Sequence, residues 1–312
     1  MDRQNFLDGL AGLLIIDMIL GHIVGFAGLT DSSWLQPLSF FMFWFYFKSG
    51  MFYRPKERMQ IMMGGGKRKL LTTFAVYSLI GHVVDCAVKY INGDMEWRHY
   101  ILTPFKDLLM TGSVSGNLPL WFLISLYCVQ VIYNEFYIRH IKPIFLFLGG
   151  LLFASLAFYL NLLYPYYIST VTLGLAAYAF GYMFRERQYK NSCLFISLVL
   201  YLVIFIFCPS FIGFRANILN DGGSYLLAVV YSLSGCIVFD NVFKKMPNCS
   251  FLQFIGKNSM EYYVTHWIIL NICSVICSRL LHWSGVESFC LMVVLSLLIP
   301  SMIIKIKTKT IK

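Results

Sequence analysis

The sequence predicts an all-α polytopic membrane protein with about ten transmembrane helices and both termini in the cytoplasm. Hydrophobic residues make up 58% of the 312-residue chain and charged residues only 13%, whereas a soluble domain is about 45–50% apolar and about 25% charged. No polar stretch is long enough to form a separate soluble domain. We therefore expect a single integral-membrane domain over residues 1–312.

Apolar segments of nearly transmembrane length recur along the whole chain. A helix needs about 20 residues to cross a hydrocarbon core about 30 Å thick. Four of the segments begin or end at a proline, so their boundaries are approximate. The ten segments that approach this length are 6–28, 35–53, 70–91, 119–137, 143–161, 165–184, 192–209, 223–243, 259–281 and 286–304.

The basic residues fit this topology. Cytoplasmic connections of membrane proteins are enriched in Lys and Arg. With the N-terminus inside, 19 of the 25 basic residues fall on the cytoplasmic side: Arg3, Arg54, Lys56, Arg58, Lys67, Arg68, Lys69, Arg139, Lys142, Arg185, Arg187, Lys190, Lys244, Lys245, Lys257, Lys305, Lys307, Lys309 and Lys312. The net charge of +10 thus reflects membrane topology and contact with lipid, and no nucleic-acid partner is expected.

Two connections differ from the rest in composition. Residues 54–69, "RPKERMQIMMGGGKRK", form a basic cytoplasmic loop that either sets the topology or contacts a phosphorylated ligand. Residues 92–118 form the longest external segment, which is either a connector at the lipid surface or a lid facing a sugar. The nine cysteines are scattered without a Cys-x-x-Cys pair, so neither a disulfide framework nor a metal site is expected.

The first apolar segment contains Asp17 and His22. A charged side chain at the centre of a bilayer costs about 3 kcal/mol or more, so such residues usually have a functional or pairing role. Because they are five residues apart, the two side chains point about 140° away from each other and cannot pair within one helix. His22 either joins neighbouring helices or acts as a base facing an internal cavity.

Two further segments carry polar residues inside the membrane. His82, Asp85 and Lys89 share one face of the third segment, where Lys89 is expected to pair with Asp85. In the ninth segment, Glu261 follows Asn258 by three residues, which resembles a capping box. His266 lies on the same helix.

Four motifs occur in an order that resembles the acyltransferase-3 family of membrane-bound O-acyltransferases, in particular its fucose-4-O-acetylase-like branch. They are "FLDGLAGLLIIDMILGHI", "FFMFWFYFKSGMFY", "NLPLWFLISLY" and "FIGKNSMEYYVTHW". Together they extend from residue 6 to about residue 270, which is nearly the whole chain.

The resemblance implies transfer of an acyl group, usually acetyl from cytosolic acetyl-CoA, to a sugar hydroxyl of a cell-surface or lipid-linked polysaccharide. It also implies that His22 is the catalytic residue, as a general base or a transient acyl carrier. The chain departs from the family at Ala11, where an arginine or lysine is expected eleven residues before the histidine. The hypothesis is that Lys48, Arg54, Arg68 or Lys69 supplies the missing cation for the CoA phosphates.

The remaining predictions concern residues around the histidine. Asp17, Glu261 and His266 are candidates for orienting His22, with Asp17 and His266 as a possible pair. Candidates for the acceptor site are Asn117, Trp121, Phe122, His82 and Asp85. No metal is expected, and the expected location is a bacterial inner membrane, in which the protein is integral.

Two other interpretations stay open at this level. The buried histidines and acids are also typical of a glycan or solute transporter that relays protons, although inverted repeats are not visible in the sequence. A catalytically inactive relative of the acyltransferases is the third interpretation, and Ala11 is its main support.

Overall fold

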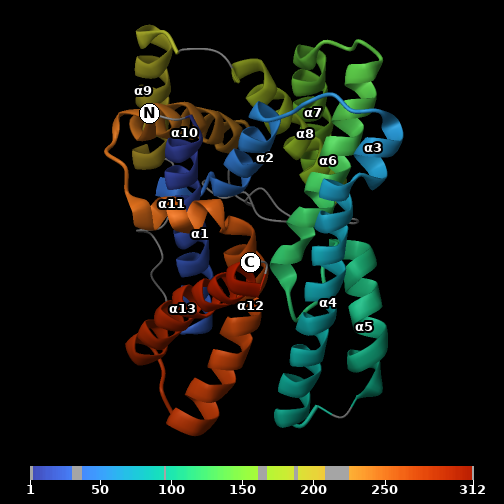
Figure 1. Cartoon of the computed structure of the whole chain (residues 1–312), viewed down its shortest axis with the longest axis vertical. Helices are drawn as coiled ribbons and strands as arrows, with labels where there is room; N and C mark the ends of the chain where they lie inside the picture. Colours follow the sequence, from blue (N-terminus) through green and yellow to red (C-terminus); the bar gives the residue numbers. More distant parts are fainter. Residues whose placement is uncertain are drawn as a thin grey trace.

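The computed structural model describes residues 3–29, 37–94, 96–160, 167–185, 189–207 and 225–310. Within this part of the chain all regular structure is helical (Figure 1), which confirms the all-α prediction. The α-helices are α1 (Arg3–Phe26), α2 (Phe41–Met51), α3 (Arg58–Met63), α4 (Gly65–Ile91), α5 (Trp97–Thr111), α6 (Trp121–Ile138), α7 (Pro143–Tyr159), α8 (Tyr167–Phe184), α9 (Asn191–Phe207), α10 (Tyr225–Lys245), α11 (Ser250–Lys257), α12 (Ser259–Val275) and α13 (Val286–Thr310). A 3₁₀ turn, η2 (Leu118–Leu120), precedes α6, and a π-helical turn, η4 (Ile276–Leu281), extends α12.

Each of the ten apolar segments contains a helix, in the expected order. Five helical segments in the described residues are long and apolar enough to cross a membrane, and three shorter helices are also apolar. The second segment contains only the short helix α2. Parts of five segments lie outside the described residues, namely 35–36, 161, 165–166, 208–209 and 223–224.

Helix α1 packs against α2, α10, α11, α12 and α13 and is surrounded by the last four in the left half of the view (Figure 1). Glycines allow the closest approaches. A Cβ atom at Gly12 would lie 2.0 Å from the carbonyl oxygen of Leu252, and one at Gly256 would lie 1.7 Å from that of Asp8. Small residues at such crossings bring helix backbones into direct contact. The short helix α11 is thereby held firmly against the first turns of α1.

A second crossing joins α2 to α8. A Cβ atom at Gly50 would lie 2.0 Å from the carbonyl oxygen of Tyr178, and one at Gly181 would lie 2.0 Å from that of Phe47. Helix α8 also packs against α6 and α7. The two crossings leave α1, α2, α6 and α12 around a common interior.

Contacts among the loops agree with the alternating topology. Arg58, Arg139 and Lys307, which were assigned to the cytoplasm, pair with carboxylates at helix ends. The N···O distances are 2.8 Å for Arg58–Glu135, 2.8 Å for Arg139–Glu135 and 2.8 Å for Lys307–Glu261, and Lys48–Asp8 forms a further ion pair at 3.2 Å. At the opposite end, the backbone N–H of Gly285 donates to the carbonyl oxygen of Ala27 over 3.1 Å. Arg187, Arg215 and Lys312 lie outside the described residues.

Three helices were not expected from the sequence. Helix α3 occupies part of the basic loop, α5 occupies the centre of the long external segment, and α11 precedes the ninth segment. The predicted capping box at Asn258 is wrong: Asn258 begins α12 without a side-chain capping hydrogen bond. Its amide instead donates to the carbonyl oxygen of Phe254, over 2.8 Å.

Candidate active site

His22 of α1 and His266 of α12 meet inside the helix bundle. Their rings are stacked, with centroids 5.3 Å apart and an angle of 21° between the planes. The ring of Trp267 meets His22 edge-on at 5.0 Å, and Phe26 packs edge-on against Trp267 at 5.1 Å. These contacts restrict the orientation of the His22 imidazole from two sides.

The local structure of α12 determines which nitrogen of His266 carries a proton. His266 is fully buried, and its Nδ1 lies 2.7 Å from the carbonyl oxygen of Tyr263. A carbonyl only accepts, so Nδ1–H donates this bond and, in the neutral imidazole, Nε2 carries the lone pair. Among the described residues, this Nε2 atom has no hydrogen-bond partner.

The two acidic candidates lie elsewhere on these helices. Asp17 is buried and interacts electrostatically with Tyr201 of α9 and Tyr231 of α10. Within the described part of the chain, Asp17 forms neither a hydrogen bond nor an ion pair with His266. The Asp17–His266 pair is therefore absent there, because Asp17 and His22 occupy different faces of α1.

Glu261 connects helices at the cytoplasmic end of α12. Its carboxylate pairs with Lys307 of α13 at 2.8 Å and accepts a hydrogen bond from Tyr77 of α4 at 3.3 Å. Glu261 is five residues from His266, which corresponds to about 140° around the helix and about 7.5 Å along it. This geometry gives Glu261 a role in holding α4 and α13 against α12.

A cavity of about 460 Å³ lies between α1, α2, α6 and α12 on the cytoplasmic side of the histidines. On α6 it extends from Phe122 to Gln130, eight residues or about 12 Å at 1.5 Å per residue. On α12 it extends from Ser259 to Tyr263. Tyr263 is one turn before His266, and their ring centroids are 6.1 Å apart. The cavity thus ends next to the histidine pair.

Three basic residues line the cavity at its cytoplasmic part: Lys48, Arg54 and Lys56. The ammonium of Lys48 lies 3.2 Å from the carboxylate of Asp8, whereas Arg54 and Lys56 are exposed to solvent. Arg68 and Lys69 lie on the exposed first turns of α4 and do not line the cavity. Apolar side chains form most of the inner part, including Ile15, Phe45 and Phe122.

Comparison with protein families decides the assignment. The family model described as "Acyltransferase domain", that of the acyltransferase-3 family, matches residues 4–305. The chain belongs to the acyltransferase-3 family. The match covers α1, which carries His22, and α12, which carries His266. Neither the curated proteins nor the solved structures gave a significant match to the chain.

As a member of the acyltransferase-3 family, the chain is an acyltransferase that resides in a membrane. The family's basic residue in the first helix is replaced by Ala11, which is fully buried. The ammonium of Lys48 reaches α1 from α2 and lies 3.4 Å from the carbonyl oxygen of Leu7. A positive charge is therefore present one turn before Ala11, beside the cavity.

The residues predicted to bind the acceptor do not form one site. Asn117 is fully buried, and its amide donates to the carbonyl oxygen of Val264 over 2.9 Å, which joins η2 to α12. Trp121 is half-buried at the start of α6. Phe122 lines the cytoplasmic cavity instead of an external surface. Acceptor binding by Asn117 and Trp121 stays a prediction.

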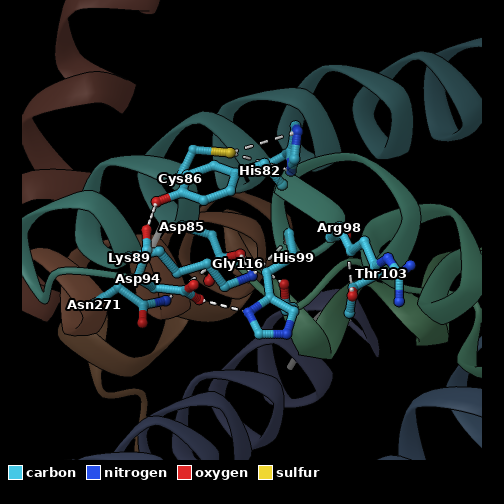
Figure 2. Close-up of polar contacts among 12 residues, drawn as sticks. His82, Asp85, Cys86, Lys89, Asp94, Arg98, His99, Thr103, Gly116 and Asn271 are labelled. Carbon is cyan, nitrogen blue, oxygen red and sulfur yellow. Dashed lines mark hydrogen bonds and ion pairs between the residues drawn. The ribbon is translucent and has the colours of Figure 1, made fainter. Parts of the chain in front are cut away.

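His82 and Asp85 belong to a polar cluster at the outer end of α4 (Figure 2). Asp85 pairs with Lys89 at 2.7 Å, which confirms that prediction, and accepts a hydrogen bond from Ser115 at 2.8 Å. Lys89 also donates to the carbonyl oxygen of His99. The ring of His82 faces the sulfur of Cys86 at 3.7–3.8 Å. The cluster connects α4 to α5 and to the segment before α6.

Several residues of this site were not singled out in the sequence, among them Lys56, Ser259, Tyr263 and Trp267. A signal was available for two of them. Tyr263 precedes His266 by three residues, and Trp267 follows it directly, so both lie close to the same part of α12. Lys56 belongs to a loop and Ser259 begins a helix. At such places the periodicity of the sequence does not predict where a side chain lies in space.

Proposed function

We propose that this acyltransferase moves an acyl group, usually acetyl, from cytosolic acyl-CoA to a sugar hydroxyl of a cell-surface or lipid-linked polysaccharide. The observation that supports it is the cavity with basic residues on its cytoplasmic side and the His22–His266 pair beyond its inner end. The proposal places the protein in a bacterial inner membrane.

The shape and charge of the cavity suit the donor. Its volume lies within the range of about 300–1,000 Å³ that is usual for small-molecule sites. Lys48, Arg54 and Lys56 are suited to the phosphates of CoA, and the first turn of α12, at Ser259, adds the positive end of a helix dipole. The apolar inner part is suited to the uncharged pantetheine arm, which carries the thioester towards Tyr263.

The reaction then needs a base on the acceptor side. His22 takes the proton of the sugar hydroxyl, and the hydroxyl oxygen attacks the thioester carbonyl carbon. A C–O bond forms, the C–S bond breaks, and the CoA thiolate takes the proton from His22 to leave as CoA-SH, which restores the neutral imidazole. His266 donates its Nδ1–H to the backbone, and its ring supports that of His22 as a positioning residue.

The proposal is tested with the purified protein in lipid nanodiscs, supplied with acetyl-CoA and a glycan fraction from its own host. We expect release of CoA that depends on the glycan and formation of a base-labile acetyl ester on the glycan. If no glycan fraction yields an acetyl ester, the inactive relative is favoured. If the protein, reconstituted in sealed vesicles, moves glycan across the membrane without esterification, the transporter is favoured.

A further inference from the structure

The inner end of the cavity is formed by an aromatic wall with Phe122 at its centre. The ring of Phe122 meets Tyr46 edge-on at 4.8 Å and Tyr263 edge-on at 5.7 Å. Phe45 lies 6.3 Å away on the cavity side. Only 7% of the Phe122 surface is exposed, so the ring is held tightly by its neighbours.

Both tyrosines beside Phe122 are fixed by hydrogen bonds. The hydroxyl of Tyr46 donates to Ser125 Oγ over 2.7 Å, and the hydroxyl of Tyr263 donates to the carbonyl oxygen of Pro119. These bonds join α2 to α6 and α12 to η2. The wall therefore has two immobilised rings, and the apolar ring of Phe122 packs against both at the inner end of the cavity.

The wall lies at the inner end of the cavity, next to the histidine pair. Tyr263 and Phe122 line the cavity, whereas His266, at 6.1 Å from Tyr263, and His22, stacked on His266, do not. An acyl group whose thioester reaches the inner end therefore lies against the ring of Phe122. Each additional methylene in the acyl chain must displace a packed aromatic ring, because protein interiors leave little free volume.

We propose that Phe122 restricts the donor to short acyl groups, with acetyl preferred over chains of four carbons or more. This inference rests on the proposed CoA donor. One methylene in an apolar pocket changes selectivity by about 10-fold or more. Replacing Phe122 with alanine removes the whole ring and enlarges the inner end of the cavity.

Binding of stable CoA thioethers tests this role without an acceptor. The probes are S-ethyl-CoA and S-hexyl-CoA, titrated into the full-length protein in nanodiscs, with dissociation constants from calorimetry. We expect wild type to bind S-ethyl-CoA at least about 10-fold more tightly than S-hexyl-CoA. In Phe122→Ala this preference should fall by about 10-fold or reverse, while Phe122→Leu should reduce it in part.

Phe180→Ala is the matched control, because Phe180 is similarly buried at 8% exposure, but does not line the cavity. The control should keep the wild-type preference. The inference is overturned if wild type binds the hexyl probe as tightly as the ethyl probe, or if both Phe122 variants retain the wild-type ratio. A wild-type protein that binds neither probe contradicts the proposed donor. If Phe122→Ala binds no probe, the ratio in Phe122→Leu decides.

Discussion

Replacing His266 with alanine tests whether this residue positions His22 or takes part in the chemistry. The substitution removes the ring that stacks on His22 at 5.3 Å and the hydrogen bond from Nδ1 to Tyr263. A stacked ring pair contributes about 0.5–1.5 kcal/mol beyond its buried area. At 1.36 kcal/mol for each tenfold change in rate, the expected loss in kcat is about two- to thirteen-fold.

The assay is CoA release from acetyl-CoA with saturating acceptor, and kcat and KM are determined separately. We expect KM for acetyl-CoA to stay close to wild type, because His266 does not line the cavity. Leu270→Ala is the control, since Leu270 is one turn further along α12 and equally buried. Thermal unfolding of both variants should show similar losses of stability. A decrease in kcat beyond about 100-fold for His266→Ala would refute the positioning role and indicate acid–base participation.

Three further predictions concern the donor, the fold and the outer surface. Lys48→Met should raise KM for acetyl-CoA by about 10- to 160-fold, because a hydrogen bond to a charged group contributes about 1.5–3 kcal/mol and each 1.36 kcal/mol is a factor of about ten. An equal rise in Arg68→Met would contradict the assignment of the cavity residues. Gly256→Ala should lower the midpoint of thermal unfolding, because the added Cβ would lie 1.7 Å from a backbone oxygen. The control Gly25→Ala should leave the midpoint unchanged, because its Cβ would have no atom within 4 Å. Equal midpoints in the two variants would contradict the close helix crossing. The backbone N–H of Glu96 and the side chain of His99 lower the pKa of Asp94, so its ionised form stabilises the turn above about pH 4, and this contribution is lost as the pH falls through the lowered pKa. Amide hydrogen exchange over residues 94–100 should then be faster in Asp94→Asn than in wild type at pH 7, with the difference decreasing in acid; a difference independent of pH would contradict the link.

The helices and their order follow from the sequence because hydrocarbon imposes long apolar segments and loop charges orient them. The pairing of loops through Glu135 and Glu261 agrees with this topology. Helix α5 was not predicted, since its 15 residues mix charged, aromatic and apolar side chains and carry no uniform apolar run. The helix α11 was missed for a related reason: it is only eight residues long.

The sequence predicted the types of residue that the site contains, but not which of them are in contact. His22 and His266 were both selected because imidazoles inside a membrane need an explanation. Their contact depends on the rotation of α1 against α12, which the residues of one helix alone do not reveal. The same rotation directs Asp17 towards α9 and α10. Phe122 was assigned to the acceptor side from its place near the outer start of α6, whereas its ring lines the cavity.

The central claim is that His22 supports acyl transfer to a surface glycan. The most direct test is the O-acetyl content of that glycan, measured by NMR in cells that contain wild type, His22→Ala or the exposed control His140→Ala at matched protein levels. The account predicts a specific acetyl signal in wild type and in the control, and a loss of that signal in His22→Ala, because general-base catalysis contributes about 100- to 10,000-fold. Equal acetylation in wild type and His22→Ala would contradict the account.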